Sequence, residues 1–305
     1  MQKICVIGSI NMDLTAVVNR FPTPGETLTG ISFGSYPGGK GANQAVAIGR
    51  LGGNVMLLGK VGGDPYGQHY LEVLKENAVN EKSVFVEREI STGIAVIEVD
   101  QSGENKIIVV PGANGLVDID FIDKHYETIR EYDVFLFQLE IPLETVLYTM
   151  KRLKEDKKTI ILDPAPAREL PDEIFQYIEF ITPNETEIEV LTGRAIINEV
   201  QVKEAAEALL AKGVQTVIVK AGKDGAYIVK NEQCTHVRGF RVNAIDTTAA
   251  GDSFNGGLAF SLAMGNSVED SVRFANAVAA ISTTSIGAQG AMPTLAQANV
   301  LMGAN

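Results

Sequence analysis

The chain has 305 residues, of which 45% are hydrophobic and 21% are charged, proportions that exclude a disordered or fibrous protein. Its formal net charge of −12 argues against a nucleic-acid partner, because an acidic surface repels a phosphate backbone. The N-terminal segment MQKICVIGSINMDL enters a strand pattern directly, and no run of 18 apolar residues occurs. We therefore expect a cytoplasmic protein without a membrane partner.

Short runs rich in β-branched residues alternate with helix-like segments along the chain. These runs occupy residues 3–9, 54–60, 132–138, 159–164, 180–182 and 216–222. Such alternation predicts a mostly parallel sheet whose strands are joined by helical crossovers. Ligands of such sheets lie beyond the carboxyl ends of the strands, so we expect the functional site there.

Two stretches, residues 12–36 and 90–111, interrupt this alternation. The second contains TGIAVIEVDQSGENKIIVV, which predicts a hairpin with a turn at residues 100–103. Together they predict a small β-sheet with little core of its own, which must cover a ligand, a second subunit or both. No linker divides the chain, so we expect one domain, residues 1–305, with this small sheet as its lid.

Residues 34–41 read GSYPGGKG, which is similar to the phosphate loop GxxxxGK[ST]. Gly41 stands where that loop requires a hydroxyl group, so we reject this interpretation. The spacing also lacks the third glycine of a dinucleotide fingerprint, which weakens the alternative of an NAD-dependent dehydrogenase. The segment remains a turn before a helix, with Asn43 able to bind a polar ligand, and the spacing alone leaves ligand binding and a plain turn equally open.

A second segment rich in small residues, DTTAAGDSFNGG at 246–257, overlaps the start of an apolar helix pattern at 249–264. Another helix pattern follows at 268–283. Free amide groups at the positive end of a helix suit a phosphoryl group in transfer. Asp252 in the first turn could simply cap the helix. However, the Ala-Ala-Gly run before it leaves room for a ligand near the backbone, which favours a role in chemistry.

Together, the two segments resemble the signatures of the ribokinase family of carbohydrate kinases, also called the PfkB family. The matches run over residues 38–62 and 246–258. Similar segments recur along nearly the whole chain, at residues 8–13, 21–26, 111–114, 163–166 and 182–187. The resemblance implies an α/β fold with a single ribokinase-like domain, in which a central, mostly parallel sheet is flanked by helices and carries a small β-sheet lid.

The same resemblance implies ATP-dependent phosphorylation of a sugar hydroxymethyl group, with D-ribose as the expected acceptor and D-ribose 5-phosphate as the product. A deoxyribose, fructose or nucleoside kinase of the family is the first alternative. A sugar-binding protein without activity is the second, although such a protein needs neither the Asp252 segment nor a nucleotide segment. Expected cofactors are Mg²⁺ with ATP and an activating K⁺, and the expected assembly is a homodimer formed through the lid.

Residue roles also follow from the resemblance, and they fall into four groups. Asp252 is the base, and the anion hole for the transferred phosphoryl group comprises Ala249, Ala250 and Gly251. The sugar is bound by Asn11, Asp13, Gly39, Lys40, Gly41, Asn43, Glu140 and Asp252. The nucleotide is bound by Asn184, Lys220, Gly222, Gly225, Gly251 and Asn276. Magnesium lies near Glu187, and potassium is held by Asp246, Thr248, Ser282, Ser285, Gly287 and Ala291.

Three positions depart from the commonest family pattern. Lys220 stands where threonine is frequent, Asn276 where histidine is frequent, and residues 284–288 read TSIGA where TRKGA is frequent. These departures bear on nucleotide preference and cation binding, and they leave the segment around Asp252 intact.

Overall fold

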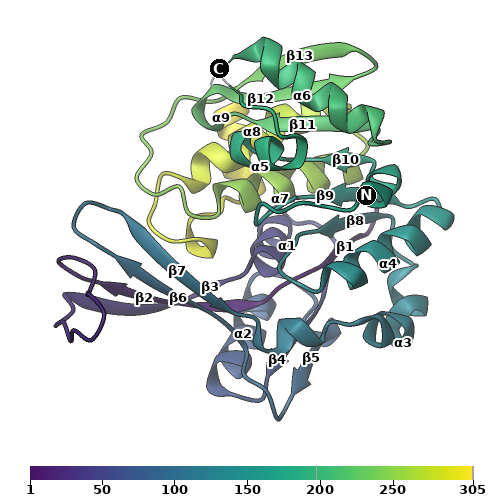
Figure 1. Cartoon of the computed structure of the whole chain (residues 1–305). Helices are drawn as coiled ribbons and strands as arrows, with labels where there is room; N and C mark the ends of the chain where they lie inside the picture. Colours follow the sequence, from purple (N-terminus) through teal and green to yellow (C-terminus); the bar gives the residue numbers. More distant parts are fainter. Residues whose placement is uncertain (197, 304–305) are drawn as a thin grey trace.

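The computed structural model describes residues 1–196 and 198–303, and these form two β-sheets. The larger sheet has nine strands within this part of the chain, in the order β13-β12-β11-β10-β9-β8-β1-β4-β5. The smaller has four strands, in the order β3-β2-β6-β7, and projects from one side of the helix-covered body (Figure 1). This arrangement confirms the predicted fold class.

The larger sheet is parallel from β5 to β11 and ends in an antiparallel hairpin. The six predicted runs coincide with six of its strands, whereas β5 and the β12–β13 hairpin were not predicted. The reason is that β13 is an edge strand with mostly exposed side chains, so it lacks an apolar run. The strands are β1 (Ile4–Ile7), β4 (Val55–Gly62), β5 (Val84–Glu87), β8 (Val134–Phe137), β9 (Thr159–Leu162), β10 (Phe180–Ile181), β11 (Thr216–Lys220), β12 (Gly225–Lys230) and β13 (Gln233–Arg238).

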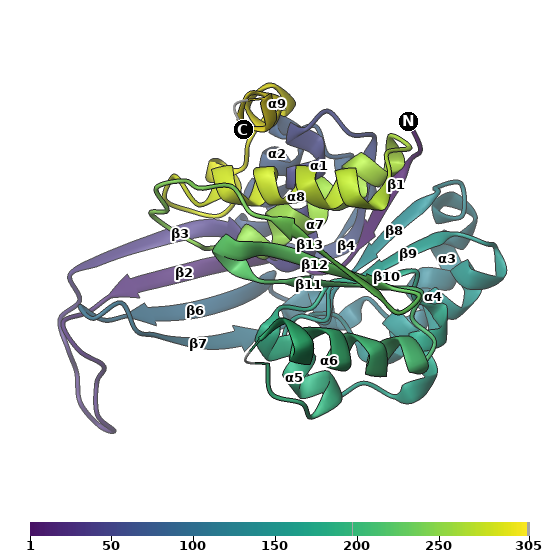
Figure 2. The same ribbon diagram turned by 90° about the horizontal axis from the view of Figure 1, so that it is seen from above.

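Helices cover both faces of the larger sheet, as Figure 2 shows from above. One face carries α1 (Lys40–Arg50), α2 (Pro65–Glu76), α7 (Ala250–Ala263) and α8 (Val268–Ser282), and α9 (Leu295–Gly303) packs on α8. The other carries α3 (Ile119–Ile129), α4 (Leu143–Glu155), α5 (Glu185–Thr192) and α6 (Glu199–Ala211). Short 3₁₀ helices are η1 (Glu81–Ser83), η2 (Gly112–Leu116), η3 (Asp172–Tyr177), η4 (Gly222–Asp224) and η5 (Gln289–Ala291). No helix of the described residues is long and apolar enough to cross a membrane.

The central strands are apolar at every position because both of their faces are buried. In β1, the side chains of Cys5 and Ile7 pack towards α3–α6, whereas Ile4 and Val6 pack towards α1, α2, α7 and α8. Each large aliphatic side chain buried in this way contributes about 1.5–3 kcal/mol to folding. The resulting continuous apolar runs are the signal that made these strands predictable.

The small sheet consists of β2 (Asn11–Val17), β3 (Ser32–Gly38), β6 (Gly93–Val99) and β7 (Asn105–Val110). β6 and β7 form the predicted hairpin, and β6 pairs in parallel with β2. Several apolar side chains of this sheet are exposed, with Phe33 at 69%, Ile108 at 65% and Ile107 at 54%. The four strands extend away from the helix-covered body (Figure 2), so these exposed apolar side chains lie on the projecting sheet.

The two helices that follow the glycine-rich and alanine-rich segments pack directly on each other. A Cβ atom on Gly256 of α7 would lie only 2.5 Å from the Ala47 Cβ of α1, so glycine permits this close contact. Gly39 and Ala249, the residues just before α1 and α7, both have positive φ values, of 86° and 57°. The left-handed conformation costs a non-glycine residue such as Ala249 roughly 1–2 kcal/mol. The packing brings the N-termini of α1 and α7 to one place.

Candidate active site

Asp252 lies in the first turn of α7 and is only 5% exposed. Its carboxylate accepts hydrogen bonds from two side chains of α1, Asn43 Nδ2 at 2.9 Å and Gln44 Nε2 at 3.2 Å. Burial raises the pKa of Asp252 to about 6, against the opposing charge of Lys40. The carboxylate is thus held by amide donors and is more basic than an ordinary aspartate.

The start of α7 carries no side-chain cap. Ala249 precedes the helix and offers no side-chain oxygen, and the hydrogen bonds of Asp252 go to α1 instead of to the helix backbone. This geometry disfavours the alternative in which Asp252 only caps the helix. The amide groups of residues 249–251 lie next to Asp252 at the positive end of the helix, which suits an anion, although that of Ala250 also donates to the Thr247 carbonyl at 3.2 Å.

The residues predicted to bind the sugar converge on Asp252 from three directions. Asp13 comes from β2, Glu140 from the segment after β8, and Lys40 from the start of α1. Burial, followed by the charges of Glu140 and Asp252, raises the pKa of Asp13 to about 7. Glu140 is fixed by hydrogen bonds from Ser9 Oγ at 2.5 Å and from the Lys40 backbone N–H at 3.0 Å. The carboxylates therefore form one acidic cluster around a lysine.

The glycines of the first segment allow the backbone of α1 to approach β1. A Cβ atom on Gly41 would lie 2.6 Å from the Ser9 nitrogen, and one on Gly39 would lie 2.6 Å from the Asn11 nitrogen. Asn11 is also held in place, since its Oδ1 accepts a hydrogen bond from Asn114 at 2.7 Å. Glycine at positions 39 and 41 is thus required by close packing, whatever ligand the segment binds.

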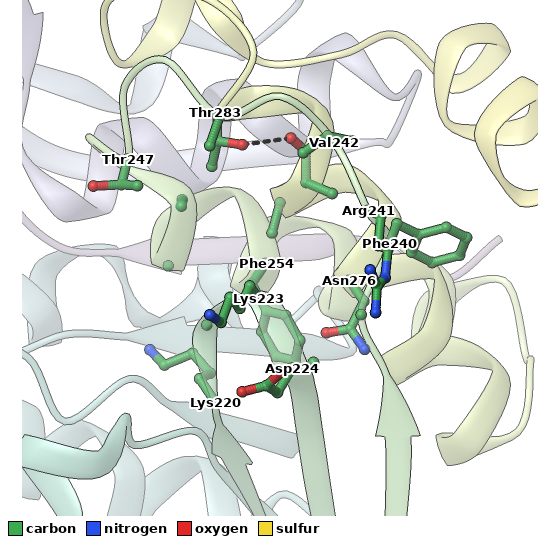
Figure 3. A pocket seen from close by; sticks show the side chains of 18 residues that line it. Lys220, Lys223, Asp224, Phe240, Arg241, Val242, Thr247, Phe254, Asn276 and Thr283 are labelled. Carbon is green, nitrogen blue, oxygen red and sulfur yellow. Dashed lines mark hydrogen bonds between the residues drawn. The ribbon is translucent and has the colours of Figure 1, made fainter.

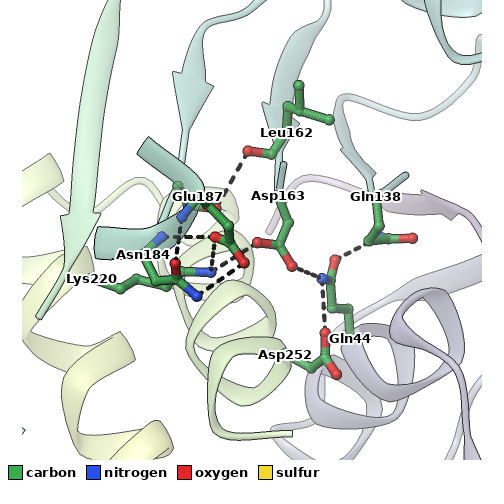
Figure 4. Close-up of polar contacts among 9 residues, drawn as sticks. Gln44, Gln138, Leu162, Asp163, Asn184, Glu187, Lys220 and Asp252 are labelled. Carbon is green, nitrogen blue, oxygen red and sulfur yellow. Dashed lines mark hydrogen bonds and ion pairs between the residues drawn. The ribbon is translucent and has the colours of Figure 1, made fainter. Parts of the chain in front are cut away.

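A chain of polar side chains extends from Asp252 across the carboxyl ends of the strands (Figure 4). Gln138 donates to Gln44 at 2.6 Å, and Gln44 donates to Asp163 at 3.0 Å as well as to Asp252. Lys220 then pairs with Asp163 at 2.8 Å. No role was predicted for Gln44, Gln138 or Asp163, although Asp163 and Gln138 directly follow strands, which is the position where site residues were expected.

Glu187 and Asn184 hold each other at the start of α5. Asn184 Oδ1 accepts from the Glu187 backbone N–H at 2.8 Å, and Glu187 Oε2 accepts from the Asn184 backbone N–H at 2.7 Å, a complete capping box. Burial raises the pKa of Glu187, and the nearby Lys220, 3.7 Å away, opposes this shift. Burial disfavours the charged form of Lys220, but the nearby carboxylates of Asp163 and Glu187 outweigh this effect and raise the pKa of Lys220.

A cavity of about 660 Å³ lies beside this chain of polar side chains, between the β11–β12 region, α7 and α8 (Figure 3). Asn276 of α8 is 6% exposed and donates through Nδ2 to the Val237 carbonyl at 3.0 Å. Asn184 is the predicted nucleotide residue that is not part of the cavity wall. The wall includes the other five, Lys220, Gly222, Gly225, Gly251 and Asn276.

The residues predicted to hold potassium lie in the loop before α7, at the end of α8 and in the segment from there to η5, and Asp246 joins the first of these to the last. Asp246 accepts from the Thr248 backbone N–H and from the Gly287 backbone N–H, both at 2.9 Å. Partial burial disfavours the charged form of Asp246, but a hydrogen bond from the Thr248 hydroxyl, together with these two backbone bonds, lowers its pKa. Ser282 instead donates to the Ala279 carbonyl of its own helix at 2.8 Å. Ser285 is exposed and Ala291 is buried.

Among the described residues, no group of three or more His, Cys, Asp and Glu side chains could hold a metal ion.

Comparison with known proteins agrees with this fold. Residues 1–295 match the pfkB family of carbohydrate kinases. The chain is 39% identical to a ribokinase of Haemophilus influenzae, with 96% of each chain aligned, and 41% identical to a ribokinase of Bacillus subtilis, with 96% of this chain and 97% of the relative aligned. It is also 37% identical to a deoxyribokinase of Salmonella typhimurium over 99% of both chains. This protein belongs to the pfkB family of carbohydrate kinases.

Two solved structures share the whole architecture. A ribokinase from Thermotoga maritima has a TM-score of 0.92 and 40% identity, covering 99% of this chain and 100% of its own. An Arabidopsis thaliana ribokinase complexed with ribose and ATP has a TM-score of 0.92 and 30% identity, covering 99% of this chain and 98% of its own. These two ribokinases therefore share the fold of this chain over nearly its whole length.

Proposed function

We propose that this protein transfers the γ-phosphoryl group of ATP to the hydroxymethyl oxygen of D-ribose, forming D-ribose 5-phosphate. The observation that carries the proposal is the position of Asp252. Asp252 accepts a hydrogen bond from Asn43, a predicted sugar-binding residue, and its neighbour Gly251 forms part of the wall of the cavity between β11–β12, α7 and α8. A sugar in the cluster and a nucleotide in the cavity would therefore meet at Asp252. Ribokinases among the relatives support ribose as the acceptor.

In the proposed mechanism, the Asp252 carboxylate takes the proton of the sugar O5 hydroxyl while O5 forms a bond to the γ-phosphorus and the bond to the ADP oxygen breaks. The amides of residues 249–251 stabilise the charge on the transferred group. Asp13, Asn43 and Glu140 hold the sugar hydroxyls, and this positioning supplies much of the rate enhancement.

The residues present fit a magnesium ion that is bound mainly by ATP. Glu187 and Asp163 place buried carboxylate oxygens beside Lys220 at the cavity wall, and hard oxygen ligands suit Mg²⁺. They are too few for an all-protein cage, which agrees with an ion that keeps water and phosphate ligands. Bound there, magnesium would neutralise phosphate charge.

ATP consumption measured with ribose, deoxyribose, fructose and adenosine tests the proposal. We expect the highest kcat/KM for ribose, because a missing hydroxyl leaves buried polar groups unpaired. A preference for deoxyribose would instead support the activity of the Salmonella relative. No ATP consumption, together with stabilisation by sugar alone in thermal unfolding, would support the sugar-binding alternative.

The affinity for ribose should depend on pH through Asp13. Ionised Asp13 accepts hydrogen bonds from the sugar, and its pKa of about 7 means that acidification removes the acceptor. Below this pH we expect the affinity to fall by up to about tenfold per unit. Titration calorimetry without ATP between pH 5 and pH 8.5 measures this. The Asp13→Asn variant should bind weakly at every pH, and an affinity of the wild type that does not vary with pH would rule out this role.

We also propose that potassium activates the enzyme by ordering residues 246–248 and 287–291 beside the anion hole. Asp246 already joins the two loops, and a cation bound to its carboxylate and to loop carbonyls would hold the start of α7. Turnover in potassium should exceed turnover in tetramethylammonium at equal ionic strength, and Asp246→Ala should abolish the difference. Equal rates in the two salts would contradict the proposal.

We further propose that residues 1–305 form one domain whose small sheet is both the lid over the sugar and the surface of a homodimer. Apolar side chains as exposed as Ile108, at 65%, and Phe33, at 69%, form a patch that a partner would cover. Light scattering at micromolar concentration should show a dimer, and Ile108→Glu a monomer. The control Val200→Glu, at an equally exposed position on α6, should remain dimeric. A fully active wild-type monomer would refute this assembly.

A further inference from the structure

Gln289 is a buried side chain that connects three separate parts of the site. It begins η5, in the segment after α8, and is 6% exposed. Its Nε2 donates to Asn43 Oδ1 at 2.9 Å and to the Tyr70 hydroxyl at 2.6 Å. Tyr70, fully buried on α2, in turn donates to the carbonyl of Gly38, where the small sheet meets the body, at 2.5 Å. No sequence motif indicated a function for Gln289 or Tyr70.

The direction of these hydrogen bonds determines which way the Asn43 amide points. A side-chain amide has an oxygen that accepts and an NH₂ group that donates. Because Gln289 donates to the Asn43 oxygen, the NH₂ group of Asn43 faces Asp252 and donates to Oδ2 at 2.9 Å. The opposite orientation would place the amide oxygen against the carboxylate and two NH₂ groups against each other.

We propose that Gln289 is a positioning residue that orients the Asn43 amide so that its NH₂ group donates to the Asp252 carboxylate. Gln289 thereby connects the segment after α8 to Asp252, the proposed proton acceptor. Through Tyr70 it also connects the end of β3 in the small sheet to the same residue. The effect on turnover rests on the proposed function, whereas the orientation of Asn43 and its effect on Asp252 do not.

A hydrogen bond to a carboxylate favours its ionised form, so the bond from Asn43 keeps the pKa of Asp252 lower than burial alone would set it. Within the described residues, the hydrogen bonds of Gln289 do not reach the charged groups that surround Asp252, so a change at position 289 acts on Asp252 through Asn43. The ionisable groups around Asp252 are Lys40 on α1, Asp163 after β9, Asp13 on β2, Glu140 after β8 and Tyr70 on α2, with Lys220 of β11 beside the neighbouring Gly251. Of these groups, the hydrogen bonds of Gln289 in the described part of the chain reach only the neutral Tyr70.

The test is the titration of the Asp252 carboxyl carbon by ¹³C NMR in the substrate-free protein, with the signal assigned by its absence in Asp252→Asn. The Gln289→Met variant keeps the side-chain length and removes the donor, which frees the Asn43 amide to turn. We expect the pKa of Asp252 to rise by up to about one unit, the value of a hydrogen bond to a charged group. The acidic limb of the kcat profile should move by the same amount.

A double-mutant cycle separates positioning from a general packing defect. In an Asn43→Ala background, the substitution Gln289→Met should not shift the pKa of Asp252 further, because the amide through which Gln289 acts is gone. The matched control Tyr70→Phe disturbs the same packing but keeps the bond from Gln289 to Asn43, so Asp252 should titrate as in the wild type. Should Gln289→Met fail to fold, Gln289→Leu serves for the same comparison.

An unchanged pKa of Asp252 in Gln289→Met, or an equal shift in both backgrounds, would overturn the inference. Failure of the proposed function gives a different pattern. If Asp252→Asn kept normal turnover while the Gln289 cycle showed the expected coupling, the base assignment would fall and the role of Gln289 would stand.

Discussion

The Asp252→Asn substitution is expected to lower kcat by about 10²- to 10⁴-fold, the usual contribution of a positioned general base. Asparagine keeps the shape of the side chain and one of the two oxygens, which accept from Asn43 and from Gln44 respectively, so one of these two hydrogen bonds can be retained. It removes the negative charge and the basicity that burial confers. Binding of ribose and ATP, measured by calorimetry, should be largely retained, so the loss should fall on the chemical step.

The measurement that decides this prediction combines kcat and melting temperature on the same preparation. Replacing the carboxylate by a neutral amide also removes a negative charge that burial and the nearby Asp163 disfavour, which offsets the loss of one hydrogen bond, so the variant should remain folded with a melting temperature near that of the wild type. Turnover within a factor of about three of wild type, well short of the range for a general base, would contradict the assignment.

The Lys220→Met substitution should destabilise the fold by about 3–5 kcal/mol, the cost of breaking a buried ion pair by removing one partner. Lys220 lies 2.8 Å from Asp163 and 3.7 Å from Glu187, and both carboxylates are buried. Without the lysine, two negative charges would remain close together in a poorly solvated place. The KM for ATP should rise as well, since Lys220 lines the cavity proposed for the nucleotide.

The destabilisation by Lys220→Met should be larger at pH 8 than at pH 5. Burial already raises the pKa of Glu187 in the fold, and loss of the lysine raises it further. A carboxyl whose pKa is raised by folding destabilises the fold above that pKa, and protonation on acidification relieves the cost. Urea unfolding at both pH values measures the difference.

A surface lysine provides the matched control for this prediction. Lys203 pairs with Glu207 at 3.6 Å, but both side chains are about 40% exposed, at 42% and 41%. The Lys203→Met substitution should therefore change stability by less than about 1 kcal/mol, with little dependence on pH. Equal effects at positions 203 and 220 would show that Lys220 does not compensate buried charge.

The sequence alone determined the elements whose signal is local. The strands from β1 to β11 that were predicted are apolar runs because both faces of the sheet are buried, and a run of this kind is visible without knowledge of its neighbours. The hairpin β6–β7 was equally visible, since alternation and a turn motif lie within a few residues. The small residues before α7 and the carboxylate of Asp252 also form one continuous segment, so the candidate base could be found from its own neighbourhood.

The tertiary structure decided which side chains surround that base. Gln44 meets Gln138 across 94 residues of chain, Gln289 meets Tyr70 across 219, and Gln289 meets Asn43 across 246. No local sequence pattern distinguishes these glutamines from other polar residues. Their positions in the site depend on the hydrogen-bond partners that the folded chain places next to them. Pairing depends on how closely α1, α2 and α7 approach one another, which contacts such as that between Gly256 and Ala47 set. Hydrogen bonds between distant segments are satisfied only in the folded chain, so no local pattern records them.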